Sequence, residues 1–390
     1  MPHLHIASFK APAFPATADG VTFHYMADNT LHDDETLIAA SVGEKAFFLL
    51  LKRLPDKTLL KADKITRPSA THFVKRALQA YAGVAGLDVL ASNVDSGEAN
   101  MHLGNDSALW TIHDFERDFP ADREIRIEVG FGSGRHLLHQ AKANPEILFI
   151  GIEIHKPSIE QVLKQINIQQ LDNLLLLDYD ARLFLELVPS NLAGRIYVHF
   201  PVPWDKKPQR RVIGEAFIAE SIRVLKPEGK LELRTDSDNY FAYSFETFMA
   251  LNQNHIEIYK NRALEVSSKY EDRWRRMEKN IYDVLMHNTE ESGPLEAIAP
   301  FAFDAITPDP AHLEALNGTT LRFDEGFVHF ERLYRTDDGR YMFRLSMGPY
   351  ARPEHLYLIL GDAPAYLPTP PVRSRTNARA HQLLIEALHG

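Results

Sequence analysis

The sequence predicts an α/β fold in its middle third: a mostly parallel, twisted sheet with helices on both faces, flanked by accessory α+β segments. Two observations predict this fold. Between residues 125 and 235, five short β-rich runs alternate with segments of helical periodicity, and strands that alternate with helices form parallel sheets. The first run is also followed by closely spaced glycines and a helical pattern, which is typical of a turn that binds a nucleotide.

The predicted elements of the middle third follow one another regularly. Pro157 begins a helix, because apolar residues recur after it at i, i+3, i+4 and i+7. A turn is expected at residues 226–229, where proline and glycine stand close together. The predicted strands are 125–129, 148–154, 174–177, 196–200 and 231–235.

The two ends of the chain have a different character. Pro68 and Ser69 open a helix near the N-terminus, and Asp338-Gly339 marks a hairpin near the C-terminus. We therefore expect three domains, at 1–118, 119–290 and 291–390, with the two end segments packed on each other. The predicted strands of the ends are 4–7, 21–25, 327–334, 341–346 and 356–360, and a last helix covers 378–388.

Composition excludes several classes of protein. The chain has 390 residues and no cysteine, which excludes disulfides, thiolate metal sites and a cysteine nucleophile. No apolar run is long enough to span a bilayer and the start lacks a signal peptide, so we expect a cytoplasmic protein without a membrane partner. None of the 18 histidines has a spacing typical of a metal site, so we expect no bound metal.

The net charge is −10, which argues against a nucleic-acid ligand, because such proteins usually carry a basic face. The charge is unevenly distributed, however. Residues 195–234 hold nine Lys or Arg against five Asp or Glu, and residues 260–279 hold seven against four. These two segments are the candidate basic surfaces.

The glycine loop is the most informative stretch. Gly130, Gly132 and Gly134 follow the first predicted strand, and glycines let the backbone turn tightly and approach a ligand. A dinucleotide fingerprint would need a glycine at 135, where Arg135 stands. Glu128 would repel a pyrophosphate but attract the ammonium group of an amino acid. The spacing therefore favours S-adenosyl-L-methionine as the cofactor.

Two further acids follow the next two predicted strands. Glu153 could accept hydrogen bonds from both ribose hydroxyls of the cofactor. Asp180 could meet the amino group of the adenine. Each acid alone could equally be a solvated surface residue, but three acids at the ends of three successive strands favour a cofactor site.

The loop after the fourth predicted strand has the composition of an RNA contact. Pro201 and Pro203 stiffen it, Trp204 offers a flat face to a base, and basic side chains could hold phosphates. The alternative is a buried tryptophan beside an exposed charged segment. The basic residues are Lys206, Lys207, Arg210 and Arg211.

Taken in order, these motifs resemble the bacterial tRNA (guanine-N7)-methyltransferases, the TrmB family, over about residues 120–285. The Pro-Trp-x-Lys-Lys segment and the later Lys-Tyr-Glu-x-Arg segment are the specific ones. The motifs are Glu128-x-Gly130-x-Gly132-x-Gly134, Gly151-Ile152-Glu153, Asp180-Ala181, Phe200-Pro201-x-Pro203-Trp204-x-Lys206-Lys207, Arg210-Arg211, Thr235-Asp236 and Lys269-Tyr270-Glu271-x-Arg273.

The resemblance implies a class I (Rossmann-like) fold and methyl transfer to N7 of guanine 46 in the variable loop of tRNA. It assigns Glu128, Glu153 and Asp180 to the cofactor, Lys206 and Asp236 to the substrate, and 268–271 to the active centre, beginning at Ser268. The chain departs from the family at Val202, where an aspartate is usual, and at Ser268, where threonine is usual.

Guanine N7 has a lone pair and no proton, so the reaction needs no obligatory general base. We expect Asp236 to be the catalytic carboxylate, stabilising the positive charge that develops on the purine. Three alternatives stay open: a methyltransferase with another acceptor, a catalytically silent RNA-binding protein with the same fold, and a nicotinamide enzyme.

Overall fold

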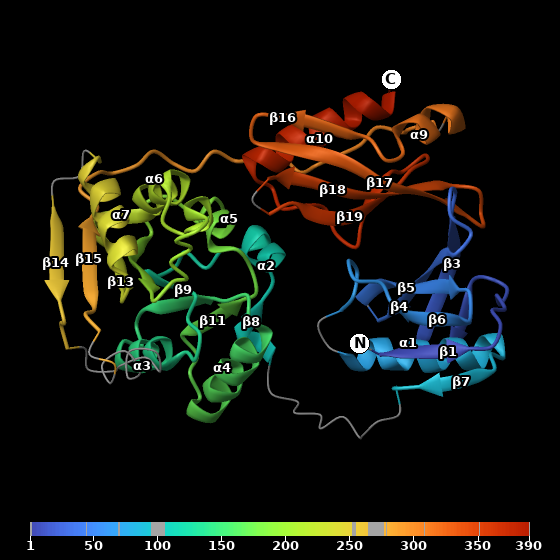
Figure 1. Cartoon of the computed structure of the whole chain (residues 1–390), viewed down its shortest axis with the longest axis horizontal. Helices are drawn as coiled ribbons and strands as arrows, with labels where there is room; N and C mark the ends of the chain where they lie inside the picture. Colours follow the sequence, from blue (N-terminus) through green and yellow to red (C-terminus); the bar gives the residue numbers. More distant parts are fainter. Residues whose placement is uncertain are drawn as a thin grey trace. The chain divides into compact units, whose positions relative to one another are not determined.

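The computed structural model describes residues 2–43, 45–68, 71–94, 106–251, 255–263, 277, 279–307, 309–350 and 352–389. The chain forms two compact units. One unit is continuous in sequence and contains the described residues from 106 to 297. The other is assembled from both ends of the chain, up to residue 94 and from residue 298 onward (Figure 1). The predicted domain bounds at 118 and 290 stay a prediction.

The unit of residues 106–297 is built on an eight-stranded sheet in the order β14-β15-β13-β12-β9-β10-β11-β8. Pairing is parallel from β8 to β13, whereas β15 runs antiparallel to both its neighbours. The strands are β8 (Leu109–Trp110), β9 (Ile125–Val129), β10 (Leu148–Ile152), β11 (Leu174–Leu177), β12 (Ala193–His199), β13 (Leu225–Thr235), β14 (Ile256–Lys260) and β15 (Tyr282–His287).

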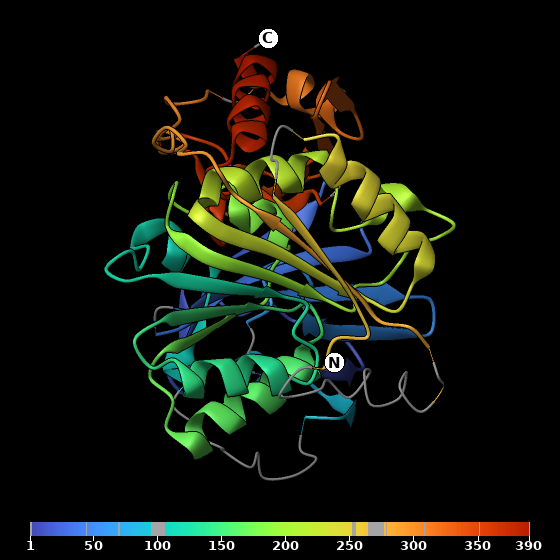
Figure 2. The same cartoon turned by 90° about the vertical axis from the view of Figure 1, so that its left-hand side faces the viewer.

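Helices cover both faces of this sheet, as predicted. Figure 2 shows α3 and α4 on one face and α6 and α7 on the other. The α3/α4 face buries an apolar cluster that includes Leu137, Val162 and Leu176. The helices of this unit are α2 (Ile112–Arg117), α3 (Arg135–Ala143), α4 (Lys156–Gln169), α5 (Ala181–Leu185), α6 (Glu215–Val224) and α7 (Asp238–Met249), with short 3-10 turns η1 (Asp106–Ala108) and η2 (Pro208–Arg210).

One local expectation is confirmed only in part. β13 already begins at Leu225, before the turn expected at residues 226–229. These four residues nevertheless have no partner in the β12 or β15 ladder, and Glu228 has a positive φ of +65°. A register irregularity lies between Ala193 and Arg195 on the neighbouring strand. The backbone of Asn288 binds Glu228 and Gly229 from the other side, at 2.8 Å each. These hydrogen bonds hold the proline- and glycine-containing stretch against the residue that follows β15.

The strand order fixes where a ligand can bind. In chain order, the parallel strands β11-β10-β9-β12-β13 read 3-2-1-4-5, the order of a doubly wound nucleotide-binding sheet. The direction of winding reverses between β9 and β12. Ligands of such sheets bind outside the carboxyl ends of the strands at this reversal, so the ends of β9 and β12 should frame the site.

The unit formed by the chain ends has a twelve-stranded sheet. Its main path is β20-β19-β18-β17-β3-β4-β5-β6-β1-β7, with β16 and β2 paired at its side. The strands are β1 (His3–Ile6), β2 (Ala16–Ala18), β3 (Val21–Asn29), β4 (Glu35–Val42), β5 (Lys45–Leu54), β6 (Lys57–Ala62), β7 (Val89–Ser92), β16 (Thr320–Phe323), β17 (Gly326–Thr336), β18 (Tyr341–Pro349), β19 (Glu354–Ile359) and β20 (Ala365–Leu367), and the helices are α1 (Thr71–Ala85), α9 (Pro310–Leu316) and α10 (Arg375–His389).

The two end segments join through β3 and β17, which pair over three residues. In a flat sheet β5 and β19 would lie about 24 Å apart, at ~4.8 Å per strand. The rings of Phe48 and Tyr357 on these strands are nevertheless 4.9 Å apart, so the sheet folds back and its halves share a core. Buried Glu35 also pairs with Arg332 and Tyr334 across the junction. The expected packing of the two ends is thereby confirmed.

Both halves of this sheet bury a second apolar cluster on their outer faces. Helix α1 covers the N-terminal half, and α10 covers the C-terminal half. Among the described residues, no helix is both long and apolar enough to cross a membrane.

Candidate active site at the carboxyl ends of the parallel strands

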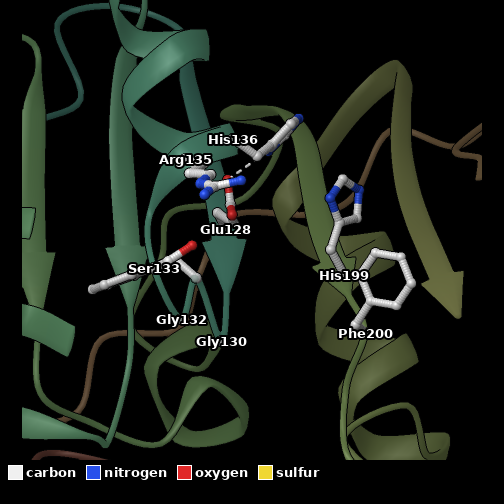
Figure 3. A pocket seen from close by; sticks show the side chains of 9 residues that line it. Glu128, Gly130, Gly132, Ser133, Arg135, His136, His199 and Phe200 are labelled. Carbon is white, nitrogen blue, oxygen red and sulfur yellow. Dashed lines mark hydrogen bonds and ion pairs between the residues drawn. The ribbon is translucent and has the colours of Figure 1, made fainter. Parts of the chain in front are cut away.

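An open cavity lies where the strand order reverses. Its walls come from the end of β9, the glycine loop, the first turn of α3 and the end of β12. Figure 3 shows these side chains converging from the two neighbouring strands. The lining residues are Glu128, Gly130, Phe131, Gly132, Ser133, Arg135, His136, His199 and Phe200.

The three glycines adopt backbone conformations that other residues avoid. Their φ angles are +70° at Gly130, +53° at Gly132 and +68° at Gly134, in the left-handed region that glycine enters without penalty. The amide of Gly130 donates to the carbonyl of Ile152 at 2.8 Å. Gly134 is the N-cap of α3 and lies directly against Val162 of α4. The loop is therefore fixed by the sheet on one side and by helix packing on the other.

Glu128 is buried at the end of β9 and is held by a histidine. His136 Nδ1 lies 2.7 Å from Glu128 Oε2, the contact drawn as a dashed line in Figure 3. Burial alone would lower the pKa of His136, but the charge and the hydrogen bond of Glu128 raise it above the ordinary value. The pair orients the Glu128 carboxylate on the cavity wall.

A second buried carboxylate orients the other histidine of the cavity. His199 Nε2 lies 3.0 Å from Glu232 Oε1, and Arg195 contacts the same carboxylate at 2.8 Å. Burial would raise the pKa of Glu232, but these partners and Arg262 lower it to about 2. The rings of His136 and His199 lie 4.6 Å apart. The two histidines therefore lie side by side on the cavity wall, and each is held by its own buried carboxylate.

His136 and His199 were missed by the sequence reasoning. Their positions in the sequence could have indicated that they belong to the site. His136 is the second residue after the last glycine of the loop, and His199 immediately precedes Phe200 and Pro201. Both are therefore placed at the carboxyl edge of the sheet by elements that the sequence did predict.

Glu153 braces the glycine loop. Its Oε2 accepts a hydrogen bond from the amide of Gly132 at 2.9 Å, and its Oε1 accepts from the amides of Ile154 at 2.8 Å and His155 at 3.0 Å. The carboxylate sits just beyond β10, as predicted. It connects the ends of two neighbouring strands, which a solvated surface acid would not do.

Asp180 follows β11 and caps α5. Its Oδ1 accepts from the amide of Arg182 at 2.9 Å, and both oxygens contact the Arg182 guanidinium, at 3.0 and 2.8 Å. The residue lies at the predicted edge of the sheet. Its assignment to the adenine stays a prediction, because the contacts with Arg182 explain its position by themselves.

The loop after β12 is held in an unusual conformation. Phe200 and Trp204 both have positive φ angles, +51° and +48°. Trp204 is 37% exposed, and the Arg210 guanidinium lies 5.2 Å from its ring centre. Lys206 and Lys207 are exposed beside it. The loop therefore presents an accessible indole and three cations on one segment.

Arg211 differs from its three basic neighbours. Only 8% of it is exposed, and it stacks on Tyr240 and Tyr243 at 5.1 and 4.6 Å. Its Nε donates to the carbonyl of Pro203 at 2.8 Å. In this arrangement Arg211 secures the loop, and the expected phosphate contacts would fall to the other three cations.

Asp236 directly follows β13, beside the end of β12. Its Oδ2 lies 2.9 Å from Lys279 Nζ. Val202, which replaces the usual aspartate, is 61% exposed. The predicted substrate residues Ser268, Lys269, Glu271 and Arg273 lie outside the described residues.

Comparison with known proteins gives the family. Residues 122–284 match a family described as "Putative methyltransferase". The chain is 43% identical to a "tRNA (guanine-N(7)-)-methyltransferase" of Wolinella succinogenes, over 100% of both chains. Proteins of the same name from Campylobacter fetus and Helicobacter pylori are 37% and 38% identical, over 100% and 98% of this chain and 99% and 98% of their own.

Among solved structures, an "antibiotic related Methyltransferase" is 21% identical and covers 43% of this chain and 88% of its own, with a TM-score of 0.33. This structural similarity covers too little of the chain to show its family. The family is shown by the sequence relatives. They align over the accessory ends as well as the central unit. The chain thus belongs to the tRNA (guanine-N(7)-)-methyltransferase family.

Proposed function

We propose that this protein transfers a methyl group from S-adenosyl-L-methionine to N7 of a guanine in tRNA, at position 46 of the variable loop. The observation that carries the proposal is the 43% identity, over both full lengths, to a protein named for this reaction. The cavity at the reversal of the strand order supports it. A tRNA substrate also implies a cytoplasmic location.

The residues of the cavity fit the proposed cofactor. A Cβ atom added at Gly130 or Gly132 would meet nothing within 4 Å, so the loop leaves room for a ligand against its backbone. The buried carboxylate of Glu128 on the wall suits a cationic group and would repel a phosphate.

When bound, S-adenosyl-L-methionine supplies an electrophilic methyl group attached to a positively charged sulfur. Glu128, oriented by His136, would attract the ammonium group of its amino-acid end. Glu153 would hold the glycine loop in place and accept a ribose hydroxyl on Oε2, which accepts one backbone hydrogen bond and can accept a second. Asp180 would meet the adenine.

The protein's task at the guanine is alignment. N7 already carries the lone pair that attacks, and positioning of this kind can lower a barrier by roughly 7–11 kcal/mol. Trp204 would stack on the base, and Lys206, Lys207 and Arg210 would bind phosphates. Asp236 would exchange Lys279 for the N1 and N2 hydrogens of the guanine and stabilise its developing positive charge.

The test is methyl transfer from labelled S-adenosyl-L-methionine to unmodified tRNA, followed by cleavage at N7-methylguanine with borohydride and aniline. The expected result is one cleavage at guanine 46. Cleavage at another guanine would overturn the position but not the reaction. Label on another acceptor, or RNA binding without methyl transfer, would overturn the function.

The role of Asp236 has a separate test. Asp236→Asn should lower the single-turnover rate with little effect on cofactor affinity, because the carboxylate acts on the guanine. Asp122→Asn is the matched control, since Asp122 is exposed just before the opposite end of β9. Equal single-turnover rates for the two variants would remove Asp236 from the mechanism.

A further inference from the structure

Three side chains that bind metals in many proteins converge away from the cavity. They are His255, just before β14, Glu257 on β14 and His287 at the end of β15. His255 and Glu257 are two residues apart and so point to the same face of the sheet. The amide of His287 donates to the carbonyl of His255 at 3.0 Å, which brings the third side chain beside them.

The geometry is that of a partly formed ligand set. One possible ligand atom from each residue lies within 4.8 Å of the other two. His287 Nε2 is 2.5 Å and His255 Nε2 is 3.8 Å from Glu257 Oε1, and the two imidazole rings stack at 3.6 Å. Ligand atoms bound to one ion at about 2.0–2.2 Å in tetrahedral geometry lie roughly 3.4 Å apart. His287 Nε2 and Glu257 Oε1 must therefore separate when the ion enters between them, and His255 Nε2 must move closer. His255 can make that movement, because its side chain is 54% exposed.

One group competes with a cation at this site. Lys230 Nζ lies 3.2 Å from Glu257 Oε1. Its side chain is 31% exposed, so the ammonium group can turn into solvent when an ion takes its place. The cluster thus has two alternative charge partners for Glu257, the lysine or a metal.

We propose that His255, Glu257 and His287 bind a divalent transition-metal ion of the zinc type, with water completing the coordination. Two imidazoles and one carboxylate favour zinc, nickel or copper over magnesium or calcium, which prefer oxygen ligands. The site lies apart from the proposed reaction. Lys230 pairs with His287 at one end of the β13/β15 ladder and Thr235 with Tyr282 at the other, about 17 Å along the strand.

The consequence is structural. β14 is the edge strand of its sheet and pairs only with β15 among the described strands. An ion shared by both strands would fix this edge. The sequence does not predict the cluster, because 30 residues separate Glu257 from His287 and only strand pairing brings them together.

The test is zinc titration of the untagged, chelator-treated full chain by calorimetry, without tRNA or cofactor. We expect one zinc ion per chain, a raised melting temperature and no response to magnesium. His255→Gln and His287→Gln should each weaken binding at least about tenfold, since even second-sphere partners of metal ligands change affinity by roughly 10–100-fold. His255 is exposed, so its variant tests the ligand without disturbing the core.

Two further variants sharpen the result. Lys230→Met should tighten zinc binding, because it removes the competing ammonium group. His113→Gln is the control, since His113 pairs with Glu116 on α2. Failure of the wild-type chain to take up zinc would overturn the site, as would stoichiometric binding that survives both ligand variants. Either outcome leaves the proposed methyl transfer untouched, because that reaction is measured separately.

Discussion

Replacing Gly134 with alanine should destabilise the central unit through two separable effects. At φ +68° a residue with a Cβ costs roughly 1–2 kcal/mol. The new Cβ would also lie 3.3 Å from Val162 Cγ1 and overlap Cγ2, and overpacking of this kind costs about 1–3 kcal/mol. The expected loss of unfolding free energy is therefore about 2–5 kcal/mol.

The matched control is Gly130→Ala. Gly130 has nearly the same φ, +70°, but its Cβ would meet nothing within 4 Å, so only the cost of about 1–2 kcal/mol should remain. Val162→Ala should be better tolerated with Gly134→Ala than alone, because it removes the overlap. The difference should reach about 1–3 kcal/mol in a double-mutant cycle.

Urea unfolding followed by tryptophan fluorescence is the suitable assay. All three tryptophans, at 110, 204 and 274, lie in the central part of the sequence, so the signal reports on that unit and not on the one formed by the chain ends. Equal destabilisation by Gly134→Ala and Gly130→Ala, or zero coupling with Val162→Ala, would refute the steric argument.

Three other substitutions test the site. Glu153→Gln should weaken binding of S-adenosylhomocysteine by about 10–150-fold in calorimetry, because a charge-assisted hydrogen bond of about 1.5–3 kcal/mol to the glycine loop is lost. The control is Glu160→Gln at an exposed position, which should not change the affinity. Equal affinities of the two variants would contradict the bracing role of Glu153. The free energy of unfolding should fall as the pH drops from about 4.5 to about 2, because the pKa of Glu232 is depressed in the folded chain. Glu232→Gln should make the urea midpoint less dependent on pH in this range. An unchanged slope would show that other carboxylates dominate. Arg211→Lys should lower the melting temperature by several degrees, because the stacking on Tyr240 and Tyr243 is lost. Arg210→Lys is the control and should leave the melting temperature unchanged. Similar melting temperatures for the two variants would contradict the buried role of Arg211.

The sequence predicted those parts of the fold that depend on local pattern. The strands at 125–129 and 174–177 and the helix that follows Gly134 appear where periodicity and glycine spacing indicated. The reversed strand β15 was not predicted, because its apolar residues, including Val284 and Leu285, fit a helical stripe as well as a buried strand. Long-range pairing decides between the two.

The placement of two candidate site residues was also predicted from local pattern. Strand ends placed Glu128 and Glu153 at one edge of the sheet, which the topology confirms. The sequence could not predict that Arg211 is buried while Arg210 is exposed, because the two residues are adjacent and have the same side chain. The difference arises from the aromatic rings of α7, which cover Arg211 in the folded chain. The roles of the substrate residues stay predictions.

The joining of β3 to β17 has a consequence for how the chain is made. About 300 residues separate these strands, so at ~5–20 residues per second the ribosome needs roughly 15–60 s between them. Throughout that interval residues 27–29 at the end of β3 have no strand partner on the side that β17 later occupies, and Glu35 is without Arg332 and Tyr334. Residues 106–297, which form the central unit, are all synthesised before β17. A nascent chain of this protein is therefore most prone to aggregate late in translation, and a stop codon before residue 326 would leave the end of β3 permanently without that partner.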